Sequence, residues 1–151
     1  MQVRRDLQRE VASARAEADR LVREMSATRL QADLAVTILT AADMRRIDLA
    51  GYEASRDAVA RAYWSPTQGL LIVADRLPAP PAGRVYQVWL IEPGAPRPVS
   101  AGVIDAASGG RGMLLVPPPA GVSNNPVIVA VTDEPRGGVL APTGSKHLAG
   151  S

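Results

Sequence analysis

Glycine and proline are absent from the first 50 residues, and this distribution limits how the chain can fold. The first glycine is Gly51, the first proline is Pro66, and the chain has 13 of each. Because both residue types interrupt helices and mark turns, the shift predicts a helical N-terminal segment followed by strands and turns. We expect a helix over residues 1–36 and a β domain over residues 37–151.

The helical segment carries an apolar heptad repeat. With Val11 at an a position, the e and g positions pair Glu10 with Arg15 and Glu24 with Arg29 across a parallel partner, whereas other such pairs are not complementary. The repeat predicts a parallel homodimer through residues 7–32. The side chains expected at this coiled-coil interface are Leu7, Val11, Ala14, Ala18, Leu21, Met25 and Thr28.

An alternative for the same segment is one amphipathic helix that packs against its own β domain. Ala14, Ala18, Thr28 and Ala32 make the apolar seam thin, which favours this alternative. Ion pairs of the coiled-coil kind select partners but contribute only tenths of a kcal/mol each. A helix of this length would extend about 54 Å, which suits a spacer or stalk.

Short β-type runs separated by turn residues fill the rest of the chain. No segment between them is long and periodic enough for a crossover helix, so a parallel α/β sheet is disfavoured. Seven such runs are typical of a sandwich or barrel, and we expect an antiparallel β-sandwich. The turn from Ser65 to Gly69 predicts a hairpin. The runs are Arg46 to Leu49, Ala58 to Trp64, Leu70 to Ala74, Val85 to Ile91, Val99 to Ile104, Met113 to Val116 and Val127 to Thr132.

The sequence offers little for catalysis. It has no cysteine and one histidine, His147, which a catalytic triad would have to use; an exposed residue near the C-terminus is the simpler expectation. No nucleophile elbow, phosphate loop or dinucleotide fingerprint is present. Four carboxylates near strand ends are expected to be solvated. They are Asp75, Asp105, Asp133 and Glu134. We expect no enzyme activity, no cofactor and no metal site.

Charge and hydropathy exclude further classes. Residues 1–36 hold seven basic and six acidic groups, residues 37–76 five and five, and residues 77–151 five and four, so no basic face for nucleic acid is expected. The uncharged stretch from Leu34 to Ala42 is too short for a membrane span, and the one from Met113 to Thr132 is broken by prolines. Charges recur through the first 30 residues, so no signal peptide is expected.

Several segments of the β domain, taken in order, resemble the C-terminal domain of anti-sigma-K factors of the RskA type. They are Leu77 to Pro78, Pro81 to Leu90, Ser100 to Gly102, Val129 to Gly138 and Pro142 to Gly144, and the resemblance extends from about Ala35 to Gly150. A Tyr-Gln-x-Trp strand combined with a Thr-x-Glu-Pro-x-Gly-Gly segment is fairly specific. The signature residues are Tyr86, Gln87, Trp89, Glu134, Pro135, Gly137, Gly138, Pro142, Thr143 and Gly144.

The resemblance implies a bacterial single-pass membrane protein. Its cytoplasmic domain would hold a sigma factor, its β domain would lie on the extracytoplasmic side, and a regulatory protease would trigger release. This sequence contains neither a transmembrane helix nor a recognisable cytoplasmic domain, so we expect the outer domain and its stalk. Six signature residues, Glu134, Pro135, Gly137, Gly138, Pro142 and Gly144, would then shape a loop by turn geometry. Gln87 lies within an apolar face of its expected strand, so it is expected to be a structural polar residue with a hydrogen-bond partner if buried.

The alternative is a soluble, coiled-coil-dimerised binding module for a cell-envelope ligand or glycan. Such modules usually present exposed aromatic side chains. The few aromatic residues of this chain are Tyr52, Tyr63, Trp64, Tyr86 and Trp89, and most fall within the expected strands.

Overall fold

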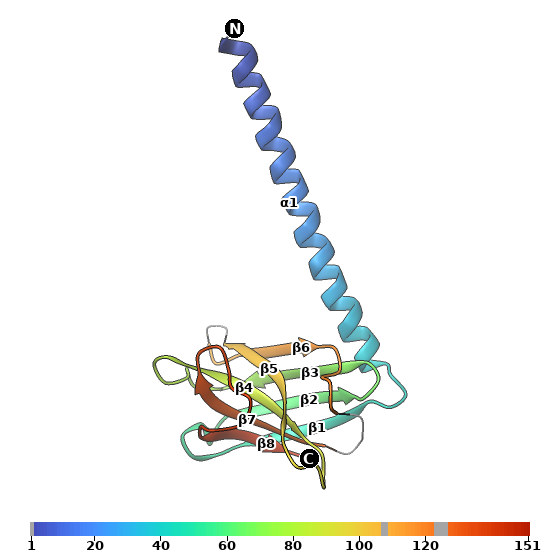
Figure 1. Cartoon of the computed structure of the whole chain (residues 1–151), viewed down its shortest axis with the longest axis vertical. Helices are drawn as coiled ribbons and strands as arrows, with labels where there is room; N and C mark the ends of the chain where they lie inside the picture. Colours follow the sequence, from blue (N-terminus) through green and yellow to red (C-terminus); the bar gives the residue numbers. More distant parts are fainter. Residues whose placement is uncertain (1, 107–108, 123–126) are drawn as a thin grey trace. The chain divides into compact units, whose positions relative to one another are not determined.

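The computed structural model describes residues 2–106, 109–122 and 127–151, with the backbone alone at positions 105 and 106. It contains a long helix, α1 (Gln2–Leu39), and a set of eight strands (Figure 1). The chain divides into two compact units, Met1–Asp33 and Leu34–Ser151. The last turns of α1 therefore belong to the same unit as the strands.

The strands form one closed antiparallel barrel in the order β1-β2-β3-β6-β5-β4-β7-β8. Figure 1 shows β8 between β7 and β1, where it completes the ring. A short 3-10 helix, η1 (Glu53–Ser55), follows the first strand. The strands are β1 (Arg45–Gly51), β2 (Val59–Ser65), β3 (Gly69–Asp75), β4 (Arg84–Ile91), β5 (Val99–Ala106), β6 (Gly112–Val116), β7 (Ile128–Pro135) and β8 (Lys146–Gly150).

The mainly antiparallel β class and the N-terminal helix are confirmed, but the expected sandwich is not. All eight strands join one closed sheet, so the described residues do not form two facing sheets. Each of the seven expected runs corresponds to a strand, with Ala58 and Val127 lying just before β2 and β7, and β2 pairs with β3 as a hairpin from Ser65↔Gly69 outward. β8 was not expected, because a five-residue segment with the single large apolar residue Leu148 gives no periodic signal.

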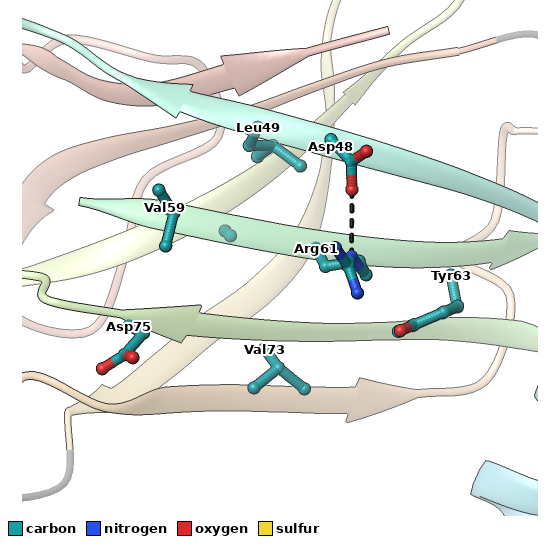
Figure 2. Close-up of a pocket in the computed structure, with 8 residues that line it drawn as sticks. Asp48, Leu49, Val59, Arg61, Tyr63, Val73 and Asp75 are labelled. Carbon is teal, nitrogen blue, oxygen red and sulfur yellow. Dashed lines mark hydrogen bonds and ion pairs between the residues drawn. The ribbon is translucent and has the colours of Figure 1, made fainter. Parts of the chain in front are cut away.

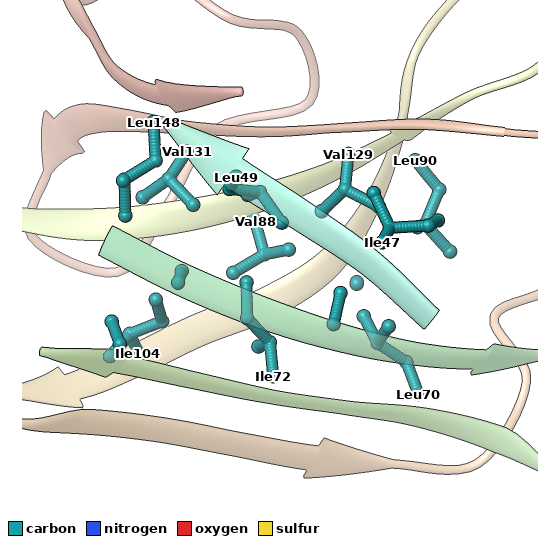
Figure 3. Packing of buried hydrophobic residues seen from close by; sticks show 14 of the residues in the cluster. Ile47, Leu49, Leu70, Ile72, Val88, Leu90, Ile104, Val129, Val131 and Leu148 are labelled. Carbon is teal, nitrogen blue, oxygen red and sulfur yellow. The ribbon is translucent and has the colours of Figure 1, made fainter. Parts of the chain in front are cut away.

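The barrel interior is filled by alternate residues of the strands. Val88 and Leu90 point inward from β4, and Val129 and Val131 point inward from β7 (Figure 3). β2 contributes small side chains, Ala60 and Ala62, next to a fully buried Trp64. Strand alternation therefore places one set of side chains in the core and leaves the opposite set facing outward. Further core residues are Ile47, Leu49, Leu70, Ile72, Ile104 and Leu148.

The end of α1 and the residues that follow it contact the turn between β2 and β3. Ile38 is fully buried, and Gly69 leaves room for it, since a Cβ on Gly69 would lie 3.2 Å from Ile38 Cδ1. The carboxylate of Asp43 accepts hydrogen bonds from the hydroxyls of Ser65 at 2.5 Å and Thr67 at 2.7 Å. These bonds lower the pKa of Asp43. The end of the helix is thus anchored to one specific turn of the barrel.

Candidate functional site

The carboxylate of Glu134 organises the loop between β7 and β8. Glu134 faces outward from the barrel but is fully buried, because the loop folds over it. The hydroxyl of Thr143 donates to Oε2 at 2.6 Å, and the backbone amides of Thr143 and Gly144 donate to Oε1 at 2.9 and 3.1 Å. The hydroxyl of Thr132 donates to the same Oε1 at 2.7 Å. Four donors on one carboxylate fix the loop in a single arrangement.

This network explains the charge state of Glu134. Burial acts to raise the pKa of Glu134, but hydrogen bonds from Thr143 and Thr132, together with the amides of Gly144 and Thr143, outweigh it. The pKa therefore lies below its ordinary 4.5. Hydrogen bonds to the charged form of a carboxylate favour that form, so these donors keep Glu134 ionised at neutral pH.

Trp89 and Gln87, on the outer face of β4, complete the same cluster. The indole Nε1 of Trp89 donates to the hydroxyl oxygen of Thr132 at 2.8 Å, which joins β4 to the Glu134 network. Gln87 bonds the loop twice: its Nε2 donates to the carbonyl of Val139 at 2.9 Å, and its Oε1 accepts from the amide of Val139 at 3.0 Å. Its Nε2 also donates to Ser100 at 2.7 Å. The buried Gln87 amide thus has hydrogen-bond partners within the protein, on β5 and in the loop.

Two signature glycines lie where no side chain fits. Gly138 has a φ of +79°, and a Cβ there would lie 3.2 Å from Oε1 of Gln87. A Cβ on Gly144 would overlap the carbonyl oxygen of Asp133. We define the signature loop as residues 135–145 and the signature cluster as that loop with the side chains of Gln87, Trp89 and Glu134. Tyr86, by contrast, points into the core, where its hydroxyl donates to the carbonyl of Pro78 at 2.7 Å and burial raises its pKa.

A second polar cluster surrounds His147, which is 6% exposed. The expectation of an exposed histidine is therefore wrong. Nδ1 lies 2.6 Å from the hydroxyl of Ser55 on η1, and Nε2 lies 2.6 Å from Oδ2 of Asp133 on β7. The guanidinium Nε of Arg84 donates to Oδ1 of Asp133 at 2.6 Å. We call Ser55, His147, Asp133 and Arg84 the clamp.

The expectation that the four carboxylates near strand ends are solvated is wrong for Asp133 and Glu134. Asp133 is 6% exposed and Glu134 is fully buried. Asp75 is partly exposed, and the side chain of Asp105 lies outside the described residues. Burial acts to raise the pKa of Asp133, but hydrogen bonds from Arg84 and His147 outweigh it, and the pKa falls below its ordinary 3.8.

Serine, histidine and aspartate in hydrogen-bonded sequence are also the parts of a catalytic triad. In a triad the serine meets Nε2 and the aspartate meets Nδ1; here Ser55 meets Nδ1 and Asp133 meets Nε2. Ser55 is 1% exposed, so its hydroxyl is closed to a substrate in this structure. The arrangement holds η1, β8, β7 and β4 together. No local sequence pattern indicates the clamp, because Ser55 and His147 are 92 positions apart in the chain.

An open groove lies on the outer face of β1, β2 and β3 (Figure 2). Its volume is about 520 Å³. Val59 and Val73 are 44% and 43% exposed, and Arg61 Nε donates to Oδ1 of Asp48 at 3.0 Å across the strands. The lining residues are Asp48, Leu49, Val59, Ala60, Arg61, Tyr63, Val73 and Asp75. This surface combines an aromatic side chain, apolar side chains and charged groups.

The expected coiled-coil residues form one side of α1. Leu7, Val11 and Leu21 are 48–55% exposed, and Met25 is 72% exposed. Among the described residues, no helix has both the length and the apolar character needed to span a membrane. No cluster of three or more potential metal ligands occurs in residues 2–106, 109–122 and 127–151 as far as their side chains are described.

Comparison with known protein families places these observations in context. The family model described as "Anti-sigma-K factor rskA, C-terminal" matches residues 2–147, nearly the whole chain and all ten signature positions. No match was found among curated proteins or among solved structures. Among the signature positions, the side chains of Gln87, Trp89 and Glu134 are buried and hydrogen-bonded, and a Cβ on Gly144 would overlap the carbonyl oxygen of Asp133. The chain belongs to the family of anti-sigma-K factor C-terminal domains.

Proposed function

We propose that this chain is the extracytoplasmic regulatory domain of a membrane-anchored anti-sigma factor, and that it controls release of the sigma factor through regulated proteolysis. The observation that carries the proposal is the family match over residues 2–147. The sigma factor would be bound by a separate cytoplasmic domain. The barrel would act outside the membrane, where a regulatory protease meets the protein.

The structure supports a protective role for the barrel. In the closed antiparallel sheet every strand pairs with a neighbour on each side, and proteases require an extended, accessible segment. The signature loop, which would otherwise be a long surface connection between β7 and β8, is fixed by the buried Glu134 carboxylate. A folded barrel therefore resists cleavage, and loss of its folding would increase access for the protease.

The location can be tested in spheroplasts of the native host that carry an epitope tag in the β domain. External proteinase K is expected to remove the tag at a rate that increases when Glu134→Gln is introduced, while a cytoplasmic marker protein stays intact. Protection of the tag until the membrane is dissolved with detergent would overturn the extracytoplasmic assignment.

The regulatory role can be tested with a reporter gene driven by the cognate sigma factor. In the native protein, Gly144→Ala should raise reporter expression without the inducing signal, because a misfolded barrel exposes the chain to the protease. Gly137→Ala is the matched control, since a Cβ at that position meets nothing within 4 Å. Unchanged expression with Gly144→Ala, despite a cleavage-sensitive barrel, would contradict the role.

A parallel homodimer through residues 7–32 is part of this proposal. The exposed apolar side of α1 includes Leu7, Val11 and Leu21, and Glu10 with Arg15 and Glu24 with Arg29 supply complementary charges for a second copy in parallel register. A paired helical stalk would set the distance between barrel and membrane and would tie the state of one barrel to that of its neighbour.

The groove on β1, β2 and β3 supports a second candidate, a binding module for a cell-envelope ligand or glycan. Tyr63 lies in that groove with the carboxylates of Asp48 and Asp75, and sugar-binding surfaces commonly combine an aromatic ring with carboxylates. Titration with soluble peptidoglycan fragments should then shift the NMR signals of Tyr63 and Val73 selectively. Saturable shifts confined to this groove would support the module, and their absence would remove it.

A further inference from the structure

β8 is the strand that closes the barrel, and its attachment on one side is slight. It pairs with β1 at only two positions, Ala50↔Ala149 and Gly51↔Leu148, with one further bond from the Tyr52 amide to the His147 carbonyl. By comparison, β4 and β7 pair at eight positions. Pairing with β1 therefore holds β8 less firmly than β4 and β7 hold each other, although β8 also pairs with β7 at four positions; β5 and β6 likewise pair at two.

The other side of β8 is irregular. Its register with β7 shifts between Val131 and Thr132, so that His147 and Leu148 are both buried although they are consecutive. Leu148 fills the core, and His147 enters the polar clamp. The bulge thus inserts the histidine between β7 and η1, where its two ring nitrogens reach both elements.

The hydrogen-bond pattern defines how the clamp works. The Asp133 carboxylate is ionised, so it can only accept, and Nε2 of His147 must carry a proton that it donates to Oδ2. Nδ1 then accepts from the Ser55 hydroxyl when the ring is neutral, or donates to the same oxygen when the ring is charged.

Several charged and titratable groups surround His147. Asp133 faces it from β7, and Tyr86 contacts it edge-on from β4 with ring centroids 5.0 Å apart. Arg84 lies behind Asp133, while on β8 itself Lys146 extends over the ring of Tyr52, 5.1 Å from its centroid. The Asp133 carboxylate lies between the Arg84 guanidinium and the His147 ring, and it accepts a hydrogen bond from each.

We infer that β8 is a releasable latch: the Ser55–His147–Asp133 contacts hold it in place, and it detaches as a unit while the rest of the barrel stays folded. The signature loop remains bonded to Glu134 through Thr143 and Gly144, so the hinge lies at Gly144 and Ser145. Release would leave the edges of β1 and β7 unpaired, a geometry that accepts an added strand. This inference concerns the barrel alone and does not depend on the proposed function.

Hydrogen–deuterium exchange of the full chain tests the latch. Ser55→Ala removes one contact of the clamp, and Ser100→Ala is the matched control, because it removes one hydrogen bond between β4 and β5, neither of which pairs with β8. Loss of one buried hydrogen bond corresponds to about a tenfold change in an opening equilibrium. We expect Ser55→Ala to accelerate exchange about tenfold in β8 and at Gly51 and Tyr52, with β2 and β3 unchanged.

A second variant, Asp133→Asn, keeps the shape of the side chain and removes its charge, and it should produce the same local pattern. Equal acceleration in β2, β3 and β8 would overturn the latch, because the clamp would then support the whole barrel. Unchanged exchange of β8 in both variants would also overturn it, because the clamp would then not hold that strand.

Discussion

Glu134 and Thr143 are nine positions apart in the chain and are joined by two hydrogen bonds, from the Thr143 hydroxyl to Oε2 at 2.6 Å and from its amide to Oε1 at 2.9 Å. Glu134 is fully buried by the loop that it fixes. The carboxylate and the loop therefore depend on each other: the loop excludes water from the charge, and the charge satisfies the donors of the loop.

Replacement of this carboxylate should destabilise the barrel strongly. Glu134→Gln removes the negative charge that accepts four hydrogen bonds and puts an amide nitrogen, which cannot accept, in place of one carboxylate oxygen. We expect the free energy of unfolding to fall by about 2 kcal/mol, measured by urea denaturation. Glu17→Gln, at an exposed position of α1, should change it by less than about 0.5 kcal/mol. Equal effects of the two substitutions would show that the buried network contributes nothing to stability.

Two of the three signature glycines, Gly144 and Gly137, should differ sharply in the stability that is lost when each is changed to alanine. A Cβ on Gly144 would overlap the backbone carbonyl of Asp133, which cannot move without breaking β7. We expect a loss of at least about 3 kcal/mol for Gly144→Ala. Gly137→Ala meets open space and should lose about 1 kcal/mol through its φ of +95° alone. Thermal melting of both variants checks the order, and a Gly144→Ala protein as stable as Gly137→Ala would contradict the geometry.

Acid should destabilise the barrel through Asp133 and Glu134. The pKa of each is lower in the folded chain than its ordinary 3.8 or 4.5, because hydrogen bonds outweigh burial. Each therefore stabilises the fold above the unfolded-state pKa, and this stabilisation is lost as pH falls through the folded-state pKa. We expect the free energy of unfolding to decrease between about pH 5 and pH 2.

Substitutions can show how much of the pH dependence of the free energy of unfolding comes from Asp133. Urea denaturation across this pH range should show a shallower decrease for Asp133→Asn than for the parent chain, because one linked proton has been removed. The exposed substitution Glu17→Gln should leave the slope unchanged. A parent-like slope in Asp133→Asn would show that this carboxylate is not part of the linkage.

The heptad seam predicts which change should separate a dimer. Leu21→Asp places a charge at a d position and should weaken self-association at least tenfold, measured by sedimentation equilibrium. Leu30→Asp is the matched control: Leu30 is 70% exposed and occupies an f position on the far side of the helix. If the parent chain sediments as a monomer at all concentrations, or if both variants dissociate alike, the seam is not an interface.

Local sequence signals predicted most of the elements but not the way the sheet closes. Turn residues and apolar runs located α1 and seven strands, since these depend on neighbours in the chain. The choice between sandwich and barrel depends on whether β8 bridges β1 and β7, and a five-residue strand with one large apolar residue carries no local signal for that pairing.

The candidate site residues also differ in whether a local sequence pattern could predict them. The signature residues were identified from a linear pattern, and most of them meet in one cluster because the Thr132-to-Gly144 segment folds back on itself. The clamp could not be predicted from the sequence, because His147 is buried by contacts with Ser55 and Asp133, which the barrel brings together from distant positions. A histidine near the C-terminus with no neighbouring motif has the sequence features of an exposed residue.

The most direct test of the central claim is an immunoblot of the native protein in separated membrane and soluble fractions, with an antibody against the β domain. The account predicts a membrane-bound band well above the 15.9 kDa of this chain, because the barrel would be the outer part of an anchored anti-sigma factor. A band found only in the soluble fraction at the mass of this chain would contradict it.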